Sequence, residues 1–289
     1  MGFMLSSALK AHLNELRLEP VGKRVRAQLG GVTALDSQRA VLVWEPRRVV
    51  PSYAVPVTDV CGSVDEATPI VAVSPAVALA PGVAVTVTAA VAPEVKRRPV
   101  WDPRVPFAVR DTAGRCVVIS IAGTDAVASG FQPDDSDLAN YVILDFNGFD
   151  TWLEDDDEIV SHPHDPFSRI DIRHTSRQVH VSLHGHPIAA STNVRILYET
   201  GLPPRYYFPR EDIQVELTAS QTVTRCAYKG TATYYSPVVG GVAVPDLAWS
   251  YEDPLVDAAG VAGCVAFFTE RVDVAIDGEL QARPHTAWS

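Results

Sequence analysis

The sequence predicts a mainly β protein made of two similar antiparallel units. Short runs of alternating apolar and polar residues recur between Gly, Pro, Asp and Asn breaks, as in Val272–Leu280, where an Asp-Gly pair marks a hairpin turn. Segments of the first half also recur in the second half in the same order, which indicates an internal repeat.

The repeat consists of matched segments that keep their order along the chain. The pairs are Leu16–Gly31 with Ile170–Gly185, Val41–Glu45 with Arg195–Glu199, Pro51–Val60 with Pro204–Ile213, and Leu138–Leu144 with Val261–Phe267. Chance is a poor explanation for an ordered series of this kind, so we interpret the chain as two homologous units with short helices.

These matches predict the domain organisation. We expect an N-terminal arm or helix at residues 1–19, a first, degenerate unit at 20–160 and a second, better preserved unit at 161–289. The first unit contains an Ala/Val/Pro-rich insertion at 62–105, which we interpret as an extended insertion or linker because it lacks clear periodicity.

The second unit contains one helix candidate. Asp257 can cap a helix that runs to Phe268 with apolar residues at helical spacing. Gly260 and Gly263 weaken that prediction, so a strand that starts near Val261 is the alternative.

Composition excludes several classes of protein. The chain has 289 residues, 47% of them hydrophobic, and a formal net charge of −11, which argues against a nucleic-acid or anionic-membrane partner. No run is long enough to span a membrane, and the N-terminus lacks the pattern of a secretory signal. We therefore expect a cytoplasmic protein; the oligomeric state stays open.

No metal or cofactor is expected. The four cysteines lie far apart in sequence, so there is no C-x-x-C signature, and sparse cysteine fits a reducing compartment. His180, His184 and His186 are explained by exposed polar faces, and the acidic run Glu154–Glu158 is typical of a solvated loop.

Three motifs of the second unit carry a family resemblance. Arg205–Asp212 (Arg-Tyr-Tyr-Phe-Pro-Arg-Glu-Asp), Cys226–Gly230 (Cys-Ala-Tyr-Lys-Gly) and Trp249–Pro254 (Trp-Ser-Tyr-Glu-Asp-Pro) resemble the family of domain of unknown function 427, DUF427. The resemblance covers residues 165–285 and, more weakly, 16–60 and 128–172.

The resemblance implies a tandem two-copy member with two β-tent (Mss4-like) domains. The family is sometimes labelled nucleotidyltransferase, but the sequence has neither a phosphate-binding glycine loop nor a spaced pair of metal-binding aspartates. Other β-tent proteins often hold zinc through paired C-x-x-C knuckles, which this chain lacks.

The two copies differ where chemistry is expected. Arg205 is replaced by Ser52 and Arg210 by Val57 in the first copy. The other motifs are matched by Cys116–Ser120 and Ser129–Phe131, which lack the tyrosine, lysine and tryptophan. We therefore interpret the first unit as a copy that supports or covers the second, and we expect a site within residues 199–254.

Lys229 and Cys226 are the candidate catalytic residues. A lysine among aromatic strands can lose solvation and act as a base or Schiff-base nucleophile, or stay charged and hold an anion; the alternative is a solvated turn lysine. Arg225 and Lys229 favour a Cys226 thiolate, but strand alternation separates them unless the chain turns at Lys229-Gly230. The alternative is a buried, unreactive cysteine.

The candidate ligand-binding residues surround these two. Arg205 can clasp a carboxylate or phosphate, with an internal pair to Glu199 or Asp212 as the alternative. The remaining candidates are Tyr206, Tyr228, Trp249, Tyr251 and Asp253. They can form the walls of a pocket around a flat ligand and position it with a carboxylate; the alternative is that they only pack the core or turn the chain.

These residues lead to three hypotheses about function. The first is an enzyme acting on a small polar or aromatic molecule at a pocket in the second unit. The second is a non-catalytic small-molecule-binding module that uses the same pocket. The third is a structural or interaction protein, and the sequence leaves open whether the protein is an enzyme at all.

Overall fold

The computed structural model describes residues 2, 11–67, 70–71, 85–86 and 102–289. The chain divides into two units, Met1–Asp165 and Pro166–Ser289. Residues 1 and 3–10 of the expected N-terminal arm or helix, and most of the 62–105 insertion, lie outside the described residues.

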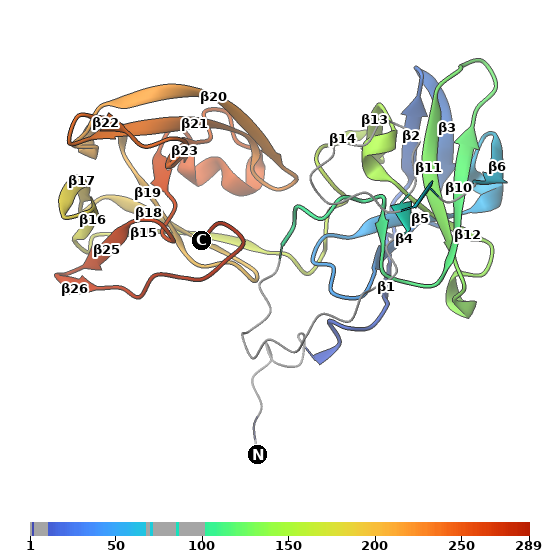
Figure 1. Cartoon of the computed structure of the whole chain (residues 1–289), viewed down its shortest axis with the longest axis horizontal. Coiled ribbons are helices and arrows are strands. Elements are labelled where there is room, and N and C mark those ends of the chain that lie inside the picture. The colour runs from blue at the N-terminus through green and yellow to red at the C-terminus, as the bar shows by residue number, and fades with distance from the viewer. Residues whose placement is uncertain (1, 3–10, 68–69, 72–84, 87–101) are drawn as a thin grey trace. The chain divides into compact units, whose positions relative to one another are not determined.

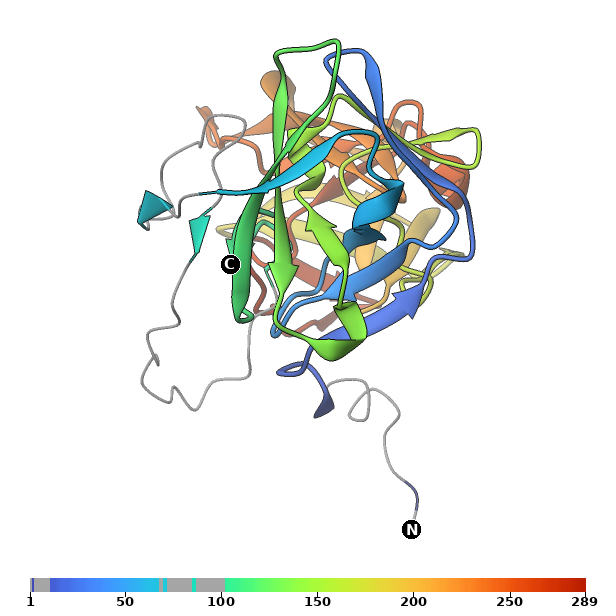
Figure 2. The same ribbon diagram turned by 90° about the vertical axis from the view of Figure 1, so that its right-hand side faces the viewer.

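The first unit is built from short strands joined by turns and 3-10 helices (Figures 1 and 2). Its strands are β1 Arg17–Pro20, β2 Val25–Leu29, β3 Val32–Ser37, β4 Val41–Trp44, β5 Ser52–Pro56, β6 Ser63–Glu66, β7 Ile70–Val71, β8 Val85–Thr86, β9 Val109–Arg110, β10 Gly114–Ser120, β11 Val127–Pro133, β12 Tyr141–Leu144, β13 Thr151–Glu154 and β14 Asp157–Ile159. Its 3-10 helices are η1 Val57–Asp59, η2 Ser136–Leu138 and η3 Phe146–Gly148.

The second unit has the same character (Figure 1). Its strands are β15 Ile170–Thr175, β16 Val179–Leu183, β17 His186–Ser191, β18 Val194–Glu199, β19 Arg205–Phe208, β20 Leu217–Cys226, β21 Gly230–Val239, β22 Val242–Ala243, β23 Ala248–Ser250, β24 Val265–Phe267, β25 Asp273–Ile276 and β26 Glu279–Leu280. Its 3-10 helices are η4 Arg210–Asp212 and η5 Val256–Val261. The prediction of a mainly antiparallel β protein is confirmed.

Both units contain one large and one small antiparallel sheet with the same strand order. The large sheets run β1-β4-β5-β12-β11-β10-β6 and β15-β18-β19-β24-β23-β21-β20. The small sheets run β14-β13-β2-β3 and β26-β25-β16-β17. Apart from β22, which pairs with β21, each strand of one large sheet therefore has a counterpart in the other, counted in chain order.

The strand registers fix this correspondence residue by residue. Val25 pairs with Ser37 in the first unit, and Val179 pairs with Ser191 in the second. In both units that serine hydroxyl donates to an aspartate of the 3-10 helix after the next large-sheet hairpin, Ser37 to Asp59 and Ser191 to Asp212. The same local design thus recurs at equivalent positions.

In each unit the main core lies between the two sheets. In the first unit it includes Val25 and Ala27 of the small sheet together with Leu42 and Tyr53 of the large sheet. Alternation along the strands sends the other side chains to the outer face of the large sheet, where a second core has formed. The second unit repeats this arrangement of an inner and an outer core.

Two local predictions have different outcomes. The hairpin turn at Asp277-Gly278 is confirmed between β25 and β26, and both of its residues have positive φ, 52° and 86°. The helix predicted for Asp257–Phe268 is wrong, because the chain forms only η5 and then β24. Gly263, with a φ of 69°, lies between the two and ends helical geometry.

No helix in the described part of the chain has both the length and the apolar character needed to span a membrane. Within the same residues, His, Cys, Asp and Glu side chains form no group of three or more that could hold a metal ion.

Candidate functional site

The turn between β20 and β21 brings the two candidate catalytic residues together. Cys226 pairs with Gly230 across the hairpin, and residues 227–229 form the turn. Gly230 adopts a φ of 89°, which a side chain would strain. Beside this turn the Lys229 ammonium group donates a hydrogen bond to Glu199, and the neighbouring Cys226 side chain helps to raise the pKa of Lys229.

The Lys229–Glu199 ion pair is nearly enclosed. The two side chains are only 11% and 10% exposed. Burial by itself lowers the pKa of Lys229, but the charge of Glu199 and the Cys226 side chain raise it, and the net direction is upward. Lys229 is therefore an ammonium ion at neutral pH, suited to holding or stabilising negative charge.

Two buried tyrosines adjoin this pair. The indole nitrogen of Trp249 donates a 3.1 Å hydrogen bond to the Tyr207 hydroxyl. Burial raises the pKa of Tyr207, and burial together with the neighbouring Tyr207 and Cys226 raises the pKa of Tyr251. Both phenols therefore stay neutral.

Arg205 is fixed by an internal carboxylate. Its guanidinium donates two bonds to Glu270, at 2.6 and 2.7 Å, and one to the Thr269 hydroxyl at 2.8 Å. Burial raises the pKa of Glu270, but the hydrogen bonds from Arg205 and Thr286 lower it by more, so the pKa of Glu270 lies below its ordinary value. The alternatives Glu199 and Asp212 are not the partners of Arg205.

Aromatic rings surround the Arg205 guanidinium. Its central carbon lies 5.7 Å from the Trp249 ring, 5.8 Å from Phe268 and 5.9 Å from Trp288. Trp249 thus contacts both the Arg205 group and the Tyr207 hydroxyl.

The structure divides the candidate residues between the two faces of the large sheet. Trp249 and Tyr251 lie in the outer core with Tyr207. Tyr206 points the opposite way, against the inner core. Tyr228 is buried within the β20–β21 turn, whereas Asp253 is exposed.

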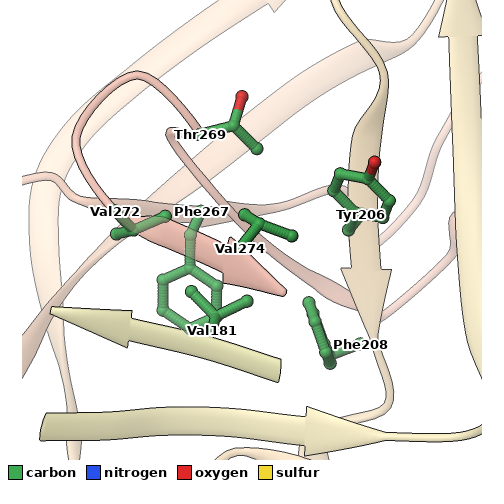
Figure 3. A pocket seen from close by; sticks show the side chains of 7 residues that line it. All are labelled: Val181, Tyr206, Phe208, Phe267, Thr269, Val272 and Val274. Atoms are coloured by element: carbon green, nitrogen blue, oxygen red, sulfur yellow. The ribbon is translucent and has the colours of Figure 1, made fainter. Parts of the chain in front are cut away.

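Tyr206 lines a pocket at the mouth of the inner core, here called the Tyr206 pocket. It has a volume of about 320 Å³. Its walls are Pro203, Pro204, Tyr206, Thr269, Val272, Val274, Gln281, Ala282, Arg283 and Pro284. An adjoining crevice has no room for water, and Figure 3 shows Tyr206 lining it from one strand, with Thr269, Val272 and Val274 on another segment.

Sequence reasoning missed several of these residues. Glu270 lies two residues after the apolar run Val265–Phe268, and a carboxylate buried next to such a run requires a cationic partner; that signal was present in the sequence. Val272 and Val274 gave no comparable signal, because alternating valines are typical of any half-buried strand.

The first unit keeps a buried charge pair at a corresponding place. The pairing of Arg17 with Trp44 and of Asp171 with Tyr198 makes Glu45 the counterpart of Glu199. Glu45 accepts from the Arg110 guanidinium at 3.1 Å, and both side chains are buried.

Two sequence matches between the units need correction. Cys116 lies on β10 opposite Phe131, whereas Tyr234 lies on the equivalent strand β21 opposite Trp249. The counterpart of Cys116 is therefore Tyr234 rather than Cys226. The next strands fix this register, since Phe131 pairs with Ile143 and Trp249 pairs with Ala266, so Phe131 rather than Ser129 corresponds to Trp249.

Comparison with known proteins agrees with the motif analysis. Residues 171–278 match the family model described as Domain of unknown function (DUF427), which confirms the predicted resemblance for this part of the second unit. No curated protein matches the sequence.

Proposed function

We propose that the DUF427 domain of this chain is a binding module for a small apolar or aromatic molecule. The observation that carries the proposal is the Tyr206 pocket of about 320 Å³. Its size lies at the lower end of the range of known ligand sites, about 300–1,000 Å³, and such sites combine apolar walls with a few polar groups.

The polar groups of the pocket support a defined ligand orientation. The Tyr206 hydroxyl stays protonated, because partial burial raises its pKa, and it can donate a hydrogen bond. The Thr269 hydroxyl is held by Arg205, which is itself fixed by Glu270. This rigid support lowers the entropic cost of binding.

A melting-temperature screen of the full chain against small molecules tests the proposal. A ligand of the folded state raises the melting temperature as its concentration exceeds the dissociation constant. Tyr206→Leu should remove that shift, while Tyr141→Leu, at a half-buried position in the first unit, should keep it. A shift that survives in Tyr206→Leu would place binding elsewhere.

The second candidate is an enzyme, and the contact between Cys226 and the Lys229–Glu199 pair favours it. In that function Cys226 is the nucleophile, and Lys229 stabilises developing negative charge. Arg205, Tyr228, Trp249, Tyr251 and Asp253 would orient the substrate. Cys226→Ala and Lys229→Met should then abolish turnover of a ligand found by the screen, without removing its binding.

We further propose that the first unit is a divergent DUF427 copy and that the protein works in a reducing cytoplasm. The shared strand order of the sheets supports the first proposal. Support for the second comes from the sequence, whose four cysteines are few and widely spaced.

A further inference from the structure

The residues that line the Tyr206 pocket have aromatic counterparts in the first unit. Leu42 pairs with Tyr53 on β4 and β5, and Ile196 pairs with Tyr206 on β18 and β19. Tyr53 therefore occupies the position of Tyr206.

The small sheets give the second correspondence. Trp152 pairs with Ala27, and Val274 pairs with Val181. Because β2 and β16 are equivalent strands in the same register, Trp152 occupies the position of Val274.

Backbone hydrogen bonds give the remaining two positions. Asp145 donates to the Ser129 carbonyl in the first unit, as Phe268 donates to the Leu247 carbonyl in the second. The next residue is Phe146 in the first unit and Thr269 in the second. Phe149 and Val272 each come three residues after it.

In the first unit these aromatic residues fill the space. The Trp152 ring lies 5.1 Å from the Tyr53 ring and stacks on Phe146, also at 5.1 Å and with an interplanar angle of 8°. Phe149 meets it edge-on at 4.9 Å. The indole N–H donates to the Phe146 carbonyl at 2.9 Å.

In the second unit smaller side chains stand at these positions, beside the pocket of about 320 Å³. Thr269, Val272 and Val274 replace three aromatic side chains, and all three line the Tyr206 pocket. Among the described residues, the Tyr206 side chain has no ring or hydrogen-bond partner, whereas the Tyr53 hydroxyl donates to Glu154. Both units have a tyrosine at this position, but the second unit lacks the aromatic groups that pack against it in the first.

We infer that the Tyr206 pocket accepts a planar bicyclic aromatic group with a ring N–H, of the size of indole. This inference rests on the proposed function and names its ligand class. The ring lies against Tyr206 as Trp152 lies against Tyr53, and its N–H is directed at the Thr269 carbonyl, the counterpart of the Phe146 carbonyl. Arg283 at the rim is paired with Asp273, at 2.8 and 3.1 Å, which favours an uncharged ring.

Two soluble probes of similar size test the ligand class on the full chain. Isothermal titration calorimetry would compare indole with cycloheptanol, which fills space but cannot stack. We expect indole to bind about tenfold more tightly, from ring stacking and one hydrogen bond together. The affinity of 1-methylindole, which lacks the N–H, should lie between those of the other two probes.

A filled pocket provides the matched variant. Val274→Trp should place a tethered indole where Trp152 lies in the first unit and lower indole affinity about tenfold or more. Val272→Phe narrows the same space and serves as the filled variant if Val274→Trp does not fold.

The outcomes separate the two proposals. If cycloheptanol binds as tightly as indole, and its binding is lost in the filled variants, the inference of an aromatic ligand is overturned. The proposal of a binding module then still holds. Unchanged indole binding in folded Val274→Trp places the ligand elsewhere and also overturns the inference. If neither probe binds and the melting-temperature screen yields no ligand, the proposed function itself fails.

Discussion

Arg205 and Glu270 form a two-bonded ion pair whose carboxylate side chain is fully buried. Replacing Glu270 by Gln leaves a buried guanidinium without its counter-charge. We expect Glu270→Gln to lower the free energy of unfolding by about 3–5 kcal/mol, measured by urea denaturation. The double variant Arg205→Met with Glu270→Met should lose less, because no charge is left unpaired. A loss in Glu270→Gln no larger than in the double variant would contradict this account.

The same carboxylate predicts an acid-sensitive component of stability. The pKa of Glu270 is lowered in the folded state, so the unfolded chain binds the proton more readily. The stabilisation is therefore present above the ordinary glutamate pKa of about 4.3 and is lost as pH falls below it through the folded value. Unfolding free energies measured across this range should fall more steeply for the wild type than for Glu270→Gln. Equal slopes would show that Glu270 is not the group responsible.

Ser250 presents the opposite situation, a buried polar group without a partner. In the described part of the chain its hydroxyl has no hydrogen bond, although the residue is fully buried. Ser250→Ala should therefore be neutral or stabilising by about 1 kcal/mol in thermal unfolding. The matched control is Ser191→Ala, which removes bonds to Asp212 and Asn193 and should destabilise by about 1–3 kcal/mol. A destabilised Ser250→Ala would mean that its hydroxyl is satisfied in solution.

At the scale of elements, the β20–β21 hairpin depends on one glycine. A Cβ on Gly230, which has a φ of 89°, would lie 3.3 Å from the Leu255 nitrogen. Gly241 also has positive φ, at 81°, but nothing lies within 4 Å of a Cβ there. Gly230→Ala should destabilise by about 1 kcal/mol or more, and by more than Gly241→Ala, because crowding adds to backbone strain. Chemical denaturation of both variants measures the difference; equal losses would assign the whole effect to φ.

Elements governed by local chemistry could be predicted from the sequence, and those decided by packing could not. The Asp277-Gly278 turn follows from residues that tolerate positive φ, and the sequence shows them directly. The segment Asp257–Phe268 has helical apolar spacing, yet Val265 and Phe267 are used in a strand of the large sheet. Periodicity over a short run does not distinguish these outcomes, because the sheet partner comes from elsewhere in the chain.

At the scale of the whole molecule, only part of the candidate site could be predicted from the sequence. The sequence predicted a turn as the condition for contact between Cys226 and Lys229, and the turn is there. It grouped Tyr206 with Trp249, although they lie on opposite faces of one sheet. Strand alternation places Arg205 and Tyr206 on different faces, but it does not say which carboxylate each cation meets, since those partners are distant in sequence.

The correspondence between the units predicts that a ligand site can be created in the first unit. Trp152→Ala removes the indole that lies against Tyr53 and Phe146, and it should lower the free energy of unfolding by about 3–5 kcal/mol. Cavities lined by apolar groups stay dry and accept apolar molecules, so indole in millimolar excess should restore part of this loss. Urea denaturation with and without indole measures the recovery, and cycloheptanol serves as the probe that fills space without stacking. Recovery with indole alone would show that this arrangement of Tyr53, Phe146 and Phe149 selects a flat ring, which is the physical premise for the Tyr206 pocket. Equal recovery with both probes would show that the space selects volume, and the comparison between the units would then say nothing about ring shape.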